Sequence, residues 1–185
     1  RLAGAGDDKG FAATLAWGLR VGLLFGLPAA VALYVLALPL VSTLFLHGAM
    51  TALDARMAAL ALQAFAVALV PLVVVKVLAP AYFAREDTAT PFRFAVAAVT
   101  TNVALNLALF SWFGHVGLAF ATAASAWVHA GLLWRGVFGA LTGLPTGVGL
   151  WRFAVAAAAM GLALWWWSPA AEAWLAAGLW VRAGW

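Results

Sequence analysis

Long apolar runs dominate the chain, and short clusters of polar, glycine or proline residues separate them. A run of about 20 apolar residues is long enough to cross a bilayer, where a helix closes its backbone hydrogen bonds internally. The pattern predicts about six membrane-spanning helices, behind a more polar segment at 1–14. Their expected bounds are 15–46, 52–83, 91–113, 116–138, 150–167 and 171–181.

Proline and glycine positions predict where these helices bend or end. The first run is longer than a bilayer needs and contains Pro28 and Pro39, so we expect it to be kinked or tilted. The glycine- and proline-rich stretch 139–147 predicts a loop, and Ser168-Pro169 ends the fifth helix. The sixth run is short for a crossing.

Three short motifs predict helix boundaries. Thr51 and Asp54 have the spacing of a capping box at the start of the second helix. Thr90 followed by Pro91 is typical of a helix N-terminus, with a hydroxyl cap and a proline at the first helical position. Gly114-His115 predicts a tight turn between the third and fourth helices.

Composition supports an all-α integral membrane protein, a bundle of transmembrane helices. Hydrophobic residues make up 67% of the chain and charged residues 9%, whereas soluble domains carry about 25% charged residues. Cysteine is absent, so neither disulfides nor thiolate metal sites hold the fold. The net charge of +4 reflects an excess of lysine and arginine in the loops on one side of the membrane. It gives no reason to invoke nucleic acid as a partner.

The distribution of lysine and arginine predicts orientation. When helix ends alternate between sides, one side collects nearly all these residues and the other has only Arg56. The positive-inside rule then makes 1–14 a cytoplasmic segment. The chain starts at Arg1 without a signal-peptide core, so we expect it to be a fragment that lacks its start. The cytoplasmic set is Arg1, Lys9, Arg20, Arg85, Arg93, Arg135, Arg152 and Arg182.

Small residues on the first helix predict close helix packing. Gly18, Gly22 and Gly26 are four residues apart and form a bare strip on one face.

Lys76 lies about two turns inside the second predicted helix. A lysine costs about 2.5 to 3.5 kcal/mol at mid-bilayer, so it either extends to the surface or faces a wet cavity. Both alternatives for Lys76 stay open. Arg85 and Asp87 follow in a charged turn, where most such charges are simply solvated.

Polar residues of the third and fourth helices predict a meeting of two faces. Asn102 and Asn106 are four residues apart, and Thr122 and Ser125 lie on one face of the next helix. Asn106 and Thr122 are each about eight residues from the turn, so we expect them at similar depth. The cluster is either a set of interhelical hydrogen bonds or a weak site for a small cation or polar substrate.

Signatures of enzymes are missing from the sequence. It contains no HExxH, GxSxG or glycine-rich phosphate loop, and no cluster of acidic residues in an apolar run. We therefore expect a protein that is not an enzyme.

Several motifs resemble one family in order along the chain. The most specific is KVLAPAYFAREDTATP at 76–91, and the others are LAWGLR at 15–20, LPAAV at 27–31, TALD at 51–54 and HVGLA at 115–119. Together with Asn102 and Asn106 they are similar to the MurJ (MviN) lipid II flippases. The resemblance covers most of 11–135 and fades after Gly139.

The resemblance implies a transporter of the multidrug/oligosaccharidyl-lipid/polysaccharide exporter superfamily, with fourteen helices in two lobes. This chain would be most of the C-terminal lobe, partnered by a missing N-terminal lobe and by membrane lipids. The substrate would be lipid II, the undecaprenyl-pyrophosphate-linked peptidoglycan precursor of cell wall biogenesis, moved across the bacterial cytoplasmic (inner) membrane. Cavity or gate candidates are then Lys76, Arg85, Asp87 and Arg20.

The resemblance also implies two sites, and it requires no cofactor. Some relatives bind sodium in this lobe, and Asn102, Asn106 and Thr122 match that site by position, but Asn106 replaces an acid. Coupling to Na⁺ or to the membrane potential therefore stays open. A groove for the lipid tail would fall around 151–181. The alternatives are an exporter of another polyprenyl-linked glycan or a drug, and a non-transporting membrane scaffold.

Overall fold

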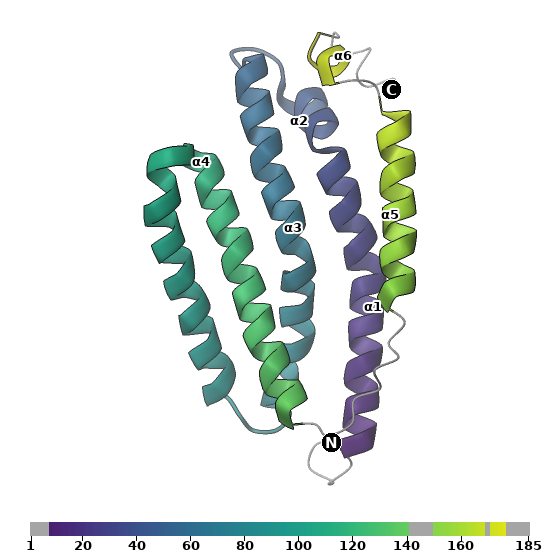
Figure 1. Ribbon diagram of the computed structural model, residues 1–185, viewed down its shortest axis with the longest axis vertical. Helices are drawn as coiled ribbons and strands as arrows, with labels where there is room; N and C mark the ends of the chain where they lie inside the picture. Colours follow the sequence, from purple (N-terminus) through teal and green to yellow (C-terminus); the bar gives the residue numbers. More distant parts are fainter. Residues whose placement is uncertain (1–7, 141–149, 169–170, 177–185) are drawn as a thin grey trace.

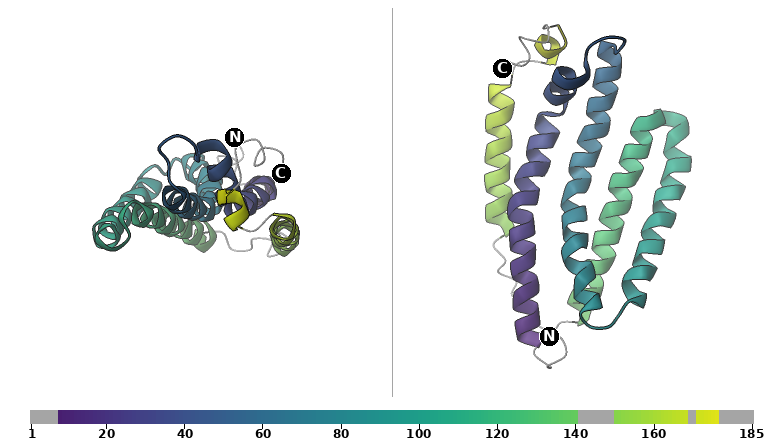
Figure 2. Two further views of the ribbon diagram at one scale, coloured as in Figure 1. Left: turned by 90° about the horizontal axis from the view of Figure 1, so that it is seen from above. Right: turned by 180° about the vertical axis from the view of Figure 1, so that it is seen from behind.

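A computed structural model describes residues 8–140, 150–168 and 171–176. Within these ranges every regular element is an α-helix, which confirms the all-α prediction. The helices stand side by side, and the views from the front and from behind agree on their order (Figures 1 and 2). They are α1 (Asp8–Val35), α2 (Ala37–Phe45), α3 (Ala52–Phe83), α4 (Ala89–Ala140), α5 (Leu150–Trp167) and α6 (Ala171–Ala176).

Three helices of the described part are long and apolar enough to cross a membrane, over Gly10–Val35, Ala52–Phe83 and Ala89–Val137. The third folds back on itself at Gly114, so it forms two antiparallel limbs (Figure 1). α3 packs against α1 on one side and α4 on the other, and α5 packs on α1. The protein is therefore a multi-pass membrane bundle with α3 at its centre.

The first predicted span divides into two helices. α1 begins at Asp8 and ends at Val35, and α2 starts after Leu36 rather than continuing the same helix. Pro39 explains the position of the break, because its ring clashes with the carbonyl four residues earlier, at Val35. Gln63 Nε2 of α3 donates to the carbonyl oxygen of Tyr34 at 3.1 Å, which satisfies a backbone acceptor beside the break.

The glycine strip packs as predicted. A Cβ added to Gly18, Gly22 or Gly26 would lie 3.2, 2.9 or 3.2 Å from methyl groups of Val77 or Val73. The absence of side chains on α1 therefore lets α3 approach closely.

The turn in α4 is confirmed at Gly114, which has φ 54° and ψ −133°. Only glycine adopts such angles without strain. Just beyond it, a Cβ on Gly117 would lie 2.7 Å from the carbonyl oxygen of Leu109, so the two limbs come into near contact at the tip.

α3 starts with the predicted capping box. Asp54 N–H donates to Thr51 Oγ1 at 3.2 Å, and Thr51 N–H donates to Asp54 Oδ2 at 2.9 Å. Thr51 Oγ1 also donates to Asp54 Oδ2 at 2.7 Å. Side-chain oxygens of these two residues therefore satisfy two backbone N–H groups at the start of the helix.

Two predicted segments lie mainly outside the described residues. α4 continues to Ala140, and the remainder of the predicted loop, 141–147, is not described. The sixth span is described only over 171–176.

Candidate functional site

A polar cluster joins the two limbs of α4. Asn102 Nδ2 donates to Thr122 Oγ1 at 3.4 Å and to Ser125 Oγ at 3.3 Å. Asn106 Nδ2 donates to Asn102 Oδ1 at 2.9 Å, one turn along the same limb. The predicted meeting of the two polar faces is therefore confirmed.

The register of the meeting differs from the prediction. Asn102, rather than Asn106, faces Thr122 across the hairpin. The close approach of Leu109 to Gly117 centres the hairpin near residue 113, so residue 102 lies level with 122–125. The hairpin is therefore centred one residue before Gly114, which shifts the facing positions by two residues.

The cluster does not fit a cation as it stands. The amide nitrogen of Asn102 points at both hydroxyls, where a cation would need oxygen ligands. The hydroxyls of Thr122 and Ser125 in turn donate to the carbonyls of Leu118 and Thr122. Asn106 Oδ1 is buried and has no hydrogen-bond partner among the described residues, and they include no group of three or more His, Cys, Asp or Glu able to hold a metal. The observed arrangement is that of interhelical hydrogen bonds.

Asn102→Leu should destabilise the protein by about 1 to 2 kcal/mol. The change removes two bonds to the opposite limb and the acceptor of Asn106, and such bonds contribute about 0.6 kcal/mol each in membranes. Asn102→Gln keeps an amide and should lose less. Unfolding in detergent measures the stability of both variants. Equal stability of Asn102→Leu and the parent would contradict a stabilising role of the polar cluster.

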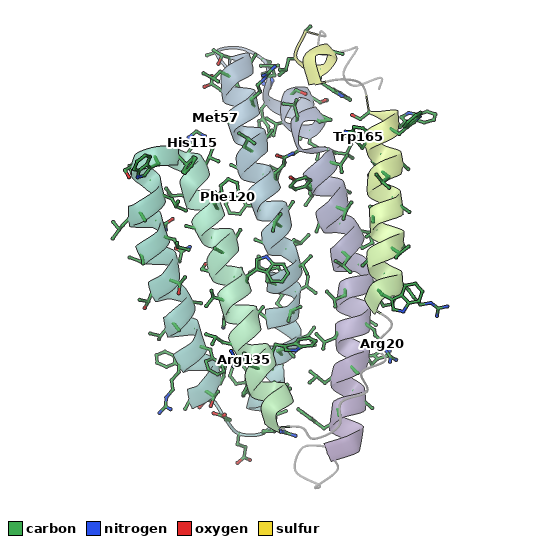
Figure 3. All side chains as sticks on the ribbon, viewed as in Figure 1. Arg20, Met57, His115, Phe120, Arg135 and Trp165 are labelled. Atoms are coloured by element: carbon green, nitrogen blue, oxygen red, sulfur yellow. The ribbon has the colours of Figure 1, made fainter. Side chains whose placement is uncertain are left out.

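The gate candidates lie in three different places. Lys76 is exposed on α3, whereas Arg85 and Asp87 lie in the turn that follows it. Arg20 is exposed on the side of α1 away from α3 (Figure 3). The glycine strip faces α3, and residue 20 is about 200° around the helix from Gly18 and Gly22. The structure therefore separates Arg20 from Lys76.

The charged turn has a defined backbone geometry. Asp87 N–H donates to Tyr82 O at 3.1 Å and Glu86 N–H donates to Phe83 O at 3.0 Å, the two bonds of a Schellman motif. Glu86 takes φ 60°, where glycine is the usual residue. Asp87 Oδ1 accepts from Thr90 N–H at 2.9 Å and caps the start of α4. The predicted cap at Thr90 is therefore wrong, because α4 already begins at Ala89.

Sequence reasoning missed the joint between α3 and α4. Tyr82 is buried, and its hydroxyl donates to Leu133 O at 3.0 Å. Its ring meets Phe94 edge to face, with centroids 6.4 Å apart. Gly136 leaves the space that the Tyr82 hydroxyl fills. The tyrosine was visible within the 76–91 motif, but its partners are distant in sequence.

Comparisons with a family profile, with curated relatives and with solved structures all match the same family. The profile of the family described as "Lipid II flippase MurJ" matches residues 1–182. The chain belongs to the MurJ lipid II flippase family.

The MurJ relatives are similar over nearly all of this chain. A probable lipid II flippase MurJ of Vibrio cholerae is 41% identical over 182 residues, 95% of this chain and 34% of its own length. One of Haemophilus influenzae is 36% identical over 178 residues, 95% of this chain and 35% of its own. The chain thus spans about a third of the length of these relatives.

A solved MurJ structure shares the fold. "Lipid II flippase MurJ, inward closed conformation" aligns with a TM-score of 0.79 and 21% identity, over 98% of this chain and 37% of that one.

One cavity adjoins the segment 151–181, for which the sequence resemblance predicts a lipid-tail groove. It has a volume of about 360 Å³ and lies between α2, α5 and α6. Its walls include Pro39, Leu40, Leu164, Trp167 and Trp174. The predicted segment 151–181 therefore contributes part of an apolar cavity, together with α2.

Proposed function

We propose that this chain is the C-terminal lobe of a lipid II flippase. In this account the complete protein moves undecaprenyl-pyrophosphate-linked peptidoglycan precursor from the inner to the outer leaflet by alternating access. The observation that carries the proposal is the family match over residues 1–182. The solved MurJ fold over 98% of the chain supports it.

The geometry fits a lobe that moves as one body. The α1–α3 contact is close along the glycine strip, and hydrogen bonds join the two limbs of α4 to each other and α4 to α3. Alternating access in such transporters is largely rigid-body rocking of one half against the other. We propose that an N-terminal lobe supplies the other half.

Lys76 is our candidate cavity cation. It lies on an exposed strip of α3 with Leu72, Pro80 and Phe83, between the faces that pack on α1 and α4. An ammonium group in a wet cavity can hold a pyrophosphate oxygen. Arg85 and Asp87, at the end of the same helix, would contribute to the inner gate. We place the start of α1 and this turn in the cytoplasm, because Arg85 and Arg93 lie at that end and Arg56 at the other.

Lys76→Ala should lower the transport rate of the complete protein about tenfold. One charge-assisted contact contributes about 1.5 to 3 kcal/mol, and 1.4 kcal/mol corresponds to a factor of ten. Lys76→Arg keeps the charge and should retain most of the rate. Full transport by a well-expressed Lys76→Ala protein would mean that this side chain extends to the surface instead.

Growth tests the proposed function as a whole. Bacteria depleted of their own lipid II flippase should regain growth and shape when the complete protein is expressed. Good membrane expression without rescue would contradict lipid II as the cargo.

A further inference from the structure

A second cavity lies at the end of the bundle where α1 begins and α3 ends. It has a volume of about 220 Å³ and is bounded by α1, α3, the charged turn and both ends of α4. In Figure 1 these segments meet at the lower end of the bundle. Because membrane-spanning helices begin and end here, the cavity lies at the depth of lipid head groups.

Among the residues that the structure describes, the walls of this cavity carry one cationic and one anionic side chain. The Arg85 guanidinium lies 4.5 Å from the centre of the Phe11 ring, and this cation–π contact orients it. Asp87 lies on the same cavity and is fixed by its bond from Thr90 N–H. The bonds to Thr90 also hold the pKa of Asp87 below its usual range, so it is ionised at neutral pH.

The remaining walls are mainly apolar. Ala81, Val137 and the ring of Tyr82 contribute them, and Gly136 adds no side chain. The volume of this cavity is below the roughly 300–1,000 Å³ of pockets that hold drug-sized ligands. A sugar-peptide head group is therefore too large to fit in it. A carboxylate beside the guanidinium also disfavours a pyrophosphate, because the like charges repel.

A small zwitterion matches this pair of charges. A guanidinium binds phosphate oxygens through two parallel hydrogen bonds. A carboxylate accepts hydrogen bonds from an ammonium that has N–H donors. We propose that this cavity binds the phosphoethanolamine head group of a membrane phospholipid, with the phosphate at Arg85 and the ammonium at Asp87. The site shares Arg85 and Asp87 with the proposed inner gate. Binding of a head group there can be measured without transport, so it does not depend on the proposed function.

The first test uses the complete protein without any substitution. Native mass spectrometry would compare retention of phosphatidylethanolamine, phosphatidylcholine and phosphatidylglycerol with identical acyl chains. Phosphatidylethanolamine should be retained at least fivefold better than the other two. The head group of phosphatidylcholine has no N–H donor, and that of phosphatidylglycerol has no cation. Equal retention, or preference for phosphatidylglycerol, would overturn the proposal. Soluble glycerophosphoethanolamine should bind at least tenfold more weakly, and equal binding would overturn the assignment to a membrane lipid.

Variants then locate the site. Asp87→Asn keeps a cap for α4, since Asn caps as well as Asp, but it should abolish the preference for phosphatidylethanolamine over phosphatidylcholine. Glu86→Gln removes a neighbouring charge that does not line the cavity, so it should leave the preference unchanged. Arg85→Gln should reduce retention of phosphatidylethanolamine at least fivefold, and Arg135→Gln is its control. If Glu86→Gln and Asp87→Asn had the same effect, the cavity would not be the site.

Discussion

Gly136→Ala is expected to destabilise the protein by about 2 to 4 kcal/mol. The new methyl group would overlap the Tyr82 hydroxyl and come within 3.2 Å of Phe94. The tyrosine would have to leave its hydrogen bond to Leu133 O, in the apolar cluster that joins α1, α3 and α4. Overpacking costs about 1 to 3 kcal/mol and a lost buried hydrogen bond about 1 kcal/mol more.

A matched control lies five residues earlier on the same limb. A Cβ on Gly131 meets nothing within 4 Å, so Gly131→Ala should be neutral or stabilising by up to about 1 kcal/mol. Adding Tyr82→Phe to Gly136→Ala removes the overlapping oxygen and should restore part of the loss. Unfolding of the complete protein in detergent measures all four proteins. Equal effects of the two glycine substitutions would contradict the described joint.

Gly117→Ala is expected to destabilise the α4 hairpin by about 2 to 3 kcal/mol. Its methyl group would meet the carbonyl oxygen and carbon of Leu109 at 2.7 and 3.0 Å. A backbone carbonyl has no rotamer by which to move aside, so the two limbs must separate. Separation lengthens the bonds from Asn102 to Thr122 and Ser125, which are already 3.4 and 3.3 Å long.

The spacing of the limbs can be measured directly. This chain has no cysteine, so cysteines introduced at the exposed positions Leu107 and Ala124 can carry spin labels. Gly117→Ala should lengthen and broaden the distance distribution between the labels, whereas Gly131→Ala should leave it unchanged. An unaltered distribution in Gly117→Ala would contradict the close approach at Leu109.

The features that follow local rules could be predicted from the sequence. Apolar runs indicated the helices, Thr51 and Asp54 indicated the capping box, and Gly114 indicated the turn. Each depends on residues within a few positions of one another, so the pattern contains the necessary information.

Features that depend on tertiary packing could not be predicted in the same way. Pro28 and Pro39 look alike in sequence. Pro28 nevertheless lies inside α1, whereas the helix is interrupted at Leu36, before Pro39. The bond from Tyr82 to Leu133 spans 51 residues, and no local pattern pairs them. The partner of Asn102 depended on the geometry of the turn.

Precursor accessibility at the outer leaflet tests most directly whether lipid II is the cargo. The complete protein would be expressed in cells depleted of their own lipid II flippase, and exposed lipid II would be scored by its cleavage or labelling from outside. We expect exposure to return with the parent protein and to fall about tenfold with Lys76→Ala. A well-expressed parent protein that restores no exposure would contradict the assignment of lipid II as the cargo.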